Sequence, residues 1–77
     1  MKQVIFEILT EIRPEFDFTK SADFIEDGML DSFDIVNLVS ILDENFLISI
    51  SGLDIIPENF SSVEKIEELL KKNGIKS

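Results

Sequence analysis

The apolar positions of this chain recur at helical spacing in three separate stretches. In the first, the residues that fall on one stripe are Val4, Ile5, Ile8, Leu9 and Ile12. Steps of three and four residues between apolar positions predict an amphipathic helix with one buried face. Pro14 limits this helix, because the residue before a proline is pushed out of the helical conformation.

The second stretch, from Asp31 to Phe46, is the clearest predicted helix. Its expected buried stripe consists of Ile35, Leu38, Val39, Leu42 and Phe46. The polar residues Asn37, Ser40, Asp43 and Glu44 fall on or beside the opposite face. Asp31 is a suitable N-cap, and Asp34 places a second carboxylate beside the unpaired N–H groups of the first turn.

A third amphipathic helix is predicted near the C-terminus, with its apolar stripe at Val63, Ile66, Leu69 and Leu70. Ser61 and Glu64 are three residues apart and predict a capping box at its start. Lys71 and Lys72 suit the negative end of the helix, and Asn73-Gly74 is expected to stop it.

The segments between the helices are less regular. Residues 14–30 contain six large apolar side chains, Phe16, Phe18, Phe24, Ile25, Met29 and Leu30, so we expect this segment to pack across the core. Residues 48–51 alternate like a strand but have no evident partner, which favours an extended loop. One short helical turn is expected at 54–57. The sum is an all-α fold, a small bundle of three main helices with a short extra helical turn.

Length and composition narrow the classes of function. Seventy-seven residues predict a single domain over 1–77. Without Cys or His, the chain has no disulfide, thiolate zinc site, Cys nucleophile or imidazole base. The small core must take nearly every large aliphatic residue and leaves little room for an elaborate active site, so we do not expect an enzyme. Residues 23–34 match a calcium loop poorly, with Ile25 at its third position, and no metal site is expected. No apolar run approaches about 18 residues and no export signal is present, so we expect a cytoplasmic protein.

The charge of the chain is strongly acidic and unevenly distributed. Sixteen acidic and seven basic residues give a net charge of −9. The 44 residues between Lys20 and Lys65 contain ten carboxylates and no Lys or Arg. Such a surface repels nucleic acid and anionic lipid and attracts basic patches on partner proteins.

The segment Gly28-Met29-Leu30-Asp31-Ser32-Phe33 carries the candidate chemistry. A serine directly after a helix cap is by itself ordinary capping chemistry. The chain offers no base to activate the Ser32 hydroxyl. If this hydroxyl reacts, another enzyme must therefore act on it.

From Asp31 to Ile50 the sequence reads Asp-Ser-Phe-Asp-x-Val-x-Leu-Val-x-x-Leu-Asp-Glu-x-Phe-x-Ile-x-Ile. It resembles the acyl carrier protein family around its 4′-phosphopantetheine attachment site, where Asp-Ser-Leu opens an acidic and aliphatic helix. The length, the acidity, the preceding Gly-x-x-Asp-Ser loop and the helix order also match, so the resemblance covers essentially the whole chain.

The resemblance implies a role for residues at several positions. Ser32 would carry the 4′-phosphopantetheine arm, with Asp31 and Phe33 as its motif neighbours. The positions implied to meet partner enzymes are Asp34, Asn37, Asp43 and Glu44. Those implied to line an acyl pocket, with simple core packing as the alternative, are Met29, Leu30, Phe46 and Ile50. The implied partners are a phosphopantetheinyl transferase and a loading ligase, synthase or transferase with a basic docking patch, acting on a monomer.

Some positions depart from the family pattern. Phe33 replaces the usual leucine, Asn37 replaces a common glutamate, and Leu47 and Ser51 stand where Gly and Pro are frequent. Two alternatives to an acyl carrier therefore stay open. One is an aminoacyl carrier of the D-alanyl or peptidyl type, loaded by an adenylating ligase. The other is an acidic helical adaptor that binds its partners without covalent modification.

Overall fold

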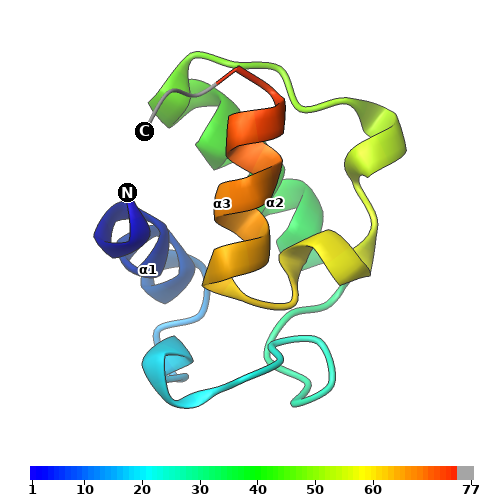
Figure 1. Ribbon diagram of the computed structural model, residues 1–77. Coiled ribbons are helices and arrows are strands. Elements are labelled where there is room, and N and C mark those ends of the chain that lie inside the picture. The colour runs from blue at the N-terminus through cyan, green and yellow to red at the C-terminus, as the bar shows by residue number, and fades with distance from the viewer. Residues whose placement is uncertain (75–77) are drawn as a thin grey trace.

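The computed structural model describes residues 1–74, in which three α-helices and three short 3-10 turns follow one another (Figure 1). The helices are α1 (Lys2–Ile12), α2 (Ser32–Phe46) and α3 (Val63–Lys72). The 3-10 turns are η1 (Phe18–Lys20), η2 (Gly52–Asp54) and η3 (Pro57–Phe60). No strand occurs in residues 1–74, so the predicted all-α class is confirmed.

Helix α1 forms where the first apolar stripe predicted it. Ile5, Ile8 and Leu9 are buried, whereas Val4 lies at the edge of the stripe and is 37% exposed. The helix ends at Ile12, and the backbone N–H of Arg13 donates to the Leu9 carbonyl over 2.9 Å. The end of α1 directly before Pro14 agrees with the prediction.

Helix α2 begins with the predicted cap and buries the predicted stripe. Asp31 is the N-cap and forms a reciprocal capping box with Asp34. The apolar residues buried along the helix are Ile35, Leu38, Val39 and Leu42, with Phe46 half-buried beside them. The helix ends at Phe46, and the next residue, Leu47, adopts the left-handed conformation with φ 54° and ψ 48°.

The predicted capping box of α3 is wrong by one residue. The cap is Ser62, whose side chain accepts from the backbone N–H of Lys65 over 3.2 Å. Ser61 keeps a helical backbone at the end of η3, and its hydroxyl donates to the Glu58 carbonyl. The chain becomes extended only at Ser62, with φ −152°, and this extended residue is the one that can cap the helix. The predicted stop at Asn73-Gly74 is confirmed.

The segment between α1 and α2 packs into the core, as predicted. Phe18, Phe24, Met29 and Leu30 are buried. The rings of Phe18 and Phe24 meet edge to face with centroids 5.0 Å apart. The Phe24 backbone N–H donates to the Ser61 carbonyl over 2.7 Å, which ties this segment to the chain just before α3.

The segment between α2 and α3 differs in part from its prediction. Residues 48–51 form the expected loop, but the helical turn expected at 54–57 is replaced by η2 and η3 on either side of Ile55. Ser51 caps η2 by accepting from the Leu53 N–H. Pro57 begins η3 and holds Ile56 extended, which prevents a continuous turn across these residues.

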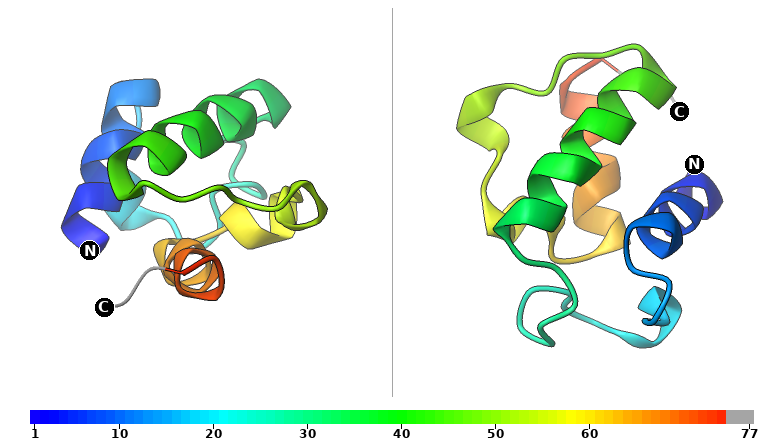
Figure 2. Two further views of the ribbon diagram at one scale, coloured as in Figure 1. Left: turned by 90° about the horizontal axis from the view of Figure 1, so that it is seen from above. Right: turned by 180° about the vertical axis from the view of Figure 1, so that it is seen from behind.

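The helices enclose one cluster of buried side chains. Helix α1 packs against both α2 and α3, while η3 packs against α3 and α2 (Figures 1 and 2). The loop before α2 runs across one end of the molecule, and α2 begins at that end (Figure 2). Among residues 1–74, no helix has the length and apolar character needed to cross a membrane.

Candidate functional site

Ser32 is the first residue of α2, and its side chain is exposed. The preceding residue, Asp31, is extended with φ −115° and ψ −175°, so the chain turns sharply into the helix at this point. One helical turn further on, Val36 lies on the same outer side and is also exposed. At helical spacing Ser32 is a neighbour of buried Ile35, three positions on, so its exposure follows from its place at the very start of α2 and not from the apolar pattern.

Two carboxylates fix the backbone around Ser32. The Asp34 backbone N–H donates to Asp31 Oδ1 over 3.0 Å, and the Asp31 backbone N–H donates to Asp34 Oδ2 over 3.1 Å. The two bonds enclose Ser32 and Phe33 in a closed turn. The serine is therefore attached to a defined backbone rather than to a free loop.

Arg13 joins this turn to the end of α1. Its Nε donates to Asp34 Oδ2 over 2.9 Å, and its Nη2 lies 2.9 Å from the same oxygen. Nη2 also donates to Asp31 Oδ2 over 3.3 Å, and Nη1 donates to Glu15 Oε2 over 3.3 Å. We call the contacts of Arg13 with Asp31 and Asp34 the Arg13 clasp.

The clasp determines the charge state of Asp34, the one buried charged or polar residue in the described part of the chain. Burial by itself would raise the pKa of Asp34. The hydrogen bonds from the Arg13 guanidinium and the Asp31 backbone outweigh that effect, so the pKa lies below its ordinary value. The same hydrogen bond to Asp34 raises the pKa of Arg13. The pair is thus ionised at neutral pH.

Arg13 was not among the site residues predicted from the sequence. One signal was available: Arg13 is the chain's single arginine, and it follows directly after the last apolar residue of α1. A guanidinium presents several donors in a planar fork, which suits two neighbouring carboxylates. Which carboxylates it meets could not be foreseen, because they lie 18 and 21 residues away.

The four positions implied to meet partners are separated by the fold. Asn37 and Glu44 are exposed on the outer side of α2. Asp34 is turned inward to Arg13, so it is not available as a free docking carboxylate. Asp43 is half-buried, and its Oδ1 accepts from the Ile50 N–H over 3.1 Å, which holds the loop after α2.

The outer side of α2 is more apolar than its sequence suggested. Phe33 is 84% exposed and Val36 is 66% exposed, and the two are three residues apart on the helix. Asn37, Ser40 and Glu44 continue this side toward the C-terminal end of α2. We call these five residues the α2 outer face. Val36 belongs to the motif around Ser32 but was not predicted as a site residue, although its place outside the buried stripe was a usable signal.

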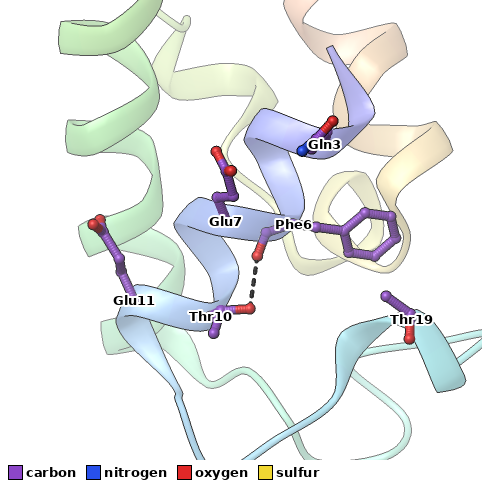
Figure 3. Close-up of a pocket in the computed structure, with 6 residues that line it drawn as sticks. All are labelled: Gln3, Phe6, Glu7, Thr10, Glu11 and Thr19. Carbon is purple, nitrogen blue, oxygen red and sulfur yellow. Dashed lines mark hydrogen bonds between the residues drawn. The ribbon is translucent and has the colours of Figure 1, made fainter.

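The residues implied to line an acyl pocket lie in or against the common core. Met29, Leu30 and Ile50 are buried in it, and Phe46 packs against it half-buried. A surface hollow occurs elsewhere, lined by Gln3, Phe6, Glu7, Thr10, Glu11 and Thr19. Figure 3 shows the Phe6 ring extending from α1 on the side where Thr19 lies, with Glu7 and Glu11 directed the other way. None of the predicted site residues lines this hollow.

The carboxylates of residues 23–34 serve local hydrogen bonds. Asp23 Oδ1 accepts from the N–H groups of Ile25 and Glu26, both over 3.0 Å. Asp27 accepts from the Ser21 hydroxyl, and Asp34 belongs to the clasp. Across residues 1–74, no three His, Cys, Asp or Glu side chains gather as a metal site requires.

Comparison with known proteins does not assign this chain to a family. No protein-family model, no curated protein and no solved structure matches it. The resemblance of the motif around Ser32 therefore stays a prediction from the sequence. Function has to be inferred from the residues and from the geometry of the first turn of α2.

Proposed function

We propose that this chain is an acyl carrier protein, which holds acyl intermediates as thioesters on a 4′-phosphopantetheine arm attached to Ser32. The observation that carries the proposal is the exposed serine at the first position of α2, inside a turn closed by Asp31 and Asp34. A carrier must offer its hydroxyl to another enzyme while its own fold stays intact. An exposed serine on a fixed helical turn meets both needs.

The residues around Ser32 suit a phosphodiester. The first turn of a helix has N–H groups without intrahelical partners and lies at the positive end of the helix dipole, which favours an anion. The carboxylates of Asp31 and Asp34 oppose an added negative charge. Arg13, within 3.3 Å of both, offsets part of that repulsion.

The absence of Cys from the chain agrees with a carrier whose reactive thiol belongs to the arm. The arm supplies the thiol that forms the thioester, so a chain without Cys lacks nothing for this role. The chain itself supplies the Ser32 oxygen and the fixed turn, and it performs no catalysis. We place it in the cytoplasm as a monomer, where a phosphopantetheinyl transferase and loading enzymes would reach it.

The α2 outer face is the surface that we propose for these enzymes. It begins beside Ser32 with the exposed side chains of Phe33 and Val36 and continues through Asn37, Ser40 and Glu44. An exposed aromatic beside an aliphatic residue is suited to insertion into an apolar pocket on a partner. A transferase that binds this face would bring its active site to Ser32.

Two other functions use parts of the same arrangement. An aminoacyl carrier loaded by an adenylating ligase would use the same serine and the same arm, with a different cargo. A non-covalent adaptor would use only the exposed Phe33 and Val36 and would leave Ser32 unmodified. Modification of Ser32 therefore separates both carriers from the adaptor.

The test is modification of the purified chain by a broad-specificity phosphopantetheinyl transferase with coenzyme A and Mg²⁺. The Ser32 oxygen forms a bond to the β-phosphorus of coenzyme A as the pyrophosphate bond breaks. Adenosine 3′,5′-bisphosphate leaves, and the serine proton passes to the transferase and solvent. Intact-protein mass spectrometry should show one addition of about 340 Da, the mass of the arm.

Ser32→Ala should abolish this addition while the helical circular dichroism stays unchanged, because Asp31 still caps α2. Ser49→Ala is the control, since Ser49 is an exposed serine outside the α2 outer face, and this variant should be modified normally. A full addition to Ser32→Ala, or none to the unchanged chain under conditions that modify a known carrier, would contradict the proposal.

A further inference from the structure

We propose that Arg13 is a positioning residue: its clasp holds the first turn of α2 against the end of α1 and so sets how Ser32 is presented to the modifying enzyme. The effect on modification rests on the function proposed above. The effect of Arg13 on the order of the turn does not depend on that function. The proposal assigns a role in the site to a residue that contacts neither Ser32 nor the arm.

Three donors from two parts of the chain converge on one oxygen. Asp34 Oδ2 accepts from the Asp31 backbone N–H over 3.1 Å and from Arg13 Nε over 2.9 Å, and Arg13 Nη2 lies 2.9 Å from it. Asp34 is 8% exposed, so water cannot readily replace these partners. Without the guanidinium, a nearly buried carboxylate would keep only its backbone bond, and the turn would have to open to hydrate it.

The clasp links two elements that a long segment separates in the sequence. The Arg13 backbone N–H is bonded to the Leu9 carbonyl, so the guanidinium is anchored to the last turn of α1. Asp31 and Asp34 belong to the first turn of α2 and lie on either side of Ser32. Residues 14–30 separate the two elements, and Arg13 bridges them directly.

The guanidinium is suited to this task by its shape as well as by its charge. Arg13 reaches Asp34 through Nε and Nη2, and Asp31 and Glu15 through its remaining contacts. A lysine could supply the charge but only a compact ammonium without the planar fork, so it would satisfy fewer of these acceptors at once. We therefore expect lysine to restore part of the effect.

The test compares Arg13→Ala and Arg13→Lys with Lys2→Ala. Lys2 is the matched control, because it also pairs with two carboxylates, Glu64 at 3.5 Å and Glu67 at 3.9 Å, but away from Ser32. Backbone ¹⁵N order parameters and transferase kinetics are measured for each variant of the full chain, at a temperature where all are folded.

In Arg13→Ala, order parameters at residues 31–35 should fall by about 0.1 or more from the value near 0.85 that is typical of rigid backbone, with α1 and α3 unchanged. The kcat/KM for modification should fall roughly tenfold, because a serine that is less well oriented reacts less often. Arg13→Lys should lie between Arg13→Ala and the unchanged chain. Lys2→Ala should match the unchanged chain in both measurements.

Unchanged order parameters at 31–35 in Arg13→Ala would overturn the proposal. An equal fall throughout α1 and α3 would overturn it as well, because it would show a general loss of stability. Altered order parameters with an unchanged kcat/KM would overturn the link to modification. If the unchanged chain is never modified, the proposed function fails, and the order parameters still decide whether Arg13 positions the turn.

Discussion

At Asp34, two opposing effects on a carboxylate can be compared directly. Removal from water favours the neutral acid, whereas the Arg13 guanidinium and the Asp31 N–H favour the carboxylate. The hydrogen bonds prevail, and the pKa of Asp34 is lowered. The ionised form of Asp34 therefore stabilises the folded chain, and this contribution must depend on pH.

The pH dependence of that contribution has a definite sign. A lowered pKa in the folded state means that the stabilisation is complete above the unfolded carboxyl pKa of about 3.9 and is lost as the pH falls through the lower folded value. Asp34→Asn, which does not titrate, should therefore be less stable than the unchanged chain by about 1–3 kcal/mol at pH 7. The difference should shrink as the pH falls below about 3.9.

Urea unfolding curves at pH 7 and at a pH below about 3.9 would measure the difference in stability between Asp34→Asn and the unchanged chain. Glu44→Gln is the control, because it removes an exposed carboxylate from the same helix, and it should have little effect at either pH. A difference between Asp34→Asn and the unchanged chain that stays constant or grows as the pH falls would show that Asp34 is not stabilised as an anion.

Single residues differ in how well their roles could be predicted from sequence. Asp31 was predicted as the N-cap of α2 and Asp34 as a carboxylate beside its first turn, because these roles depend on residues only three positions apart; the reciprocal capping box was not predicted. The inward orientation of Asp34 and Asp43 was not foreseen, since carboxylates are mostly exposed and both are held by partners distant in sequence. For the same reason, Arg13 could not be placed in the site without the fold.

At the scale of elements, the end of α2 has an unusual backbone. Leu47 is left-handed, with φ 54°, although a side chain at this conformation meets steric strain that glycine avoids. Its side chain is 90% exposed, so burial of the leucine does not offset that strain.

Leu47→Gly should therefore raise the stability of the chain by about 0.5–1 kcal/mol, measured as an increased midpoint of urea unfolding. Leu47→Ala is the matched control, because it removes the exposed leucine but keeps a Cβ at the left-handed position, and it should change stability little. If alanine stabilised as much as glycine, exposure of the leucine rather than backbone strain would be the cause.

The elements themselves were predictable where the pattern was long. Apolar periodicity located all three helices, and Pro14 and Asn73-Gly74 marked two of their ends. The short turns were not predictable in position, because three- and four-residue turns depend on single caps such as Ser51 and Pro57. The shift of the α3 cap to Ser62 follows from η3, which had not been predicted at that place.

At the scale of the molecule, the carboxylates of residues 21–64, which contain no Lys or Arg, are partly neutralised by cations from other parts of the chain. Lys2 lies 3.5 Å from Glu64, Lys72 lies 2.8 Å from Asp54, and Arg13 holds Asp31 and Asp34. Cations from before and after the stretch thus meet some of its carboxylates. The net charge is still −9, so the chain attracts basic partners over a distance and this attraction speeds association. The contacts at the interface set the rate of dissociation.

Two substitutions on the α2 outer face should separate the effect of charge from the effect of apolar contact on binding to a phosphopantetheinyl transferase. Glu44→Lys should slow association and weaken its dependence on salt, because it changes long-range attraction. Phe33→Ser should mainly speed dissociation, by roughly tenfold, because it removes an 84% exposed aromatic next to Ser32. Surface plasmon resonance at two salt concentrations measures both rates.

Ser49→Ala, an exposed position outside the α2 outer face, serves as the control and should alter neither rate. Asp43 is not a suitable position for this test, since its substitution would release the Ile50 backbone and disturb the loop after α2. A dissociation rate that is indifferent to Phe33→Ser would show that the partner does not use the apolar part of the face.

The Arg13 clasp also restricts how this sequence can diverge. If Arg13 is lost first, Asp34 is left as a nearly buried charge without its guanidinium, and if Asp34 is lost first, the guanidinium loses its main acceptor. Loss of Arg13 alone is the more harmful change, because it leaves a nearly buried carboxylate uncompensated, whereas Arg13 without Asp34 is one-third exposed and keeps Asp31 and Glu15 as partners. The tolerated order of change is therefore Asp34 first or both together, which makes position 13 dependent on position 34 although 20 residues stand between them.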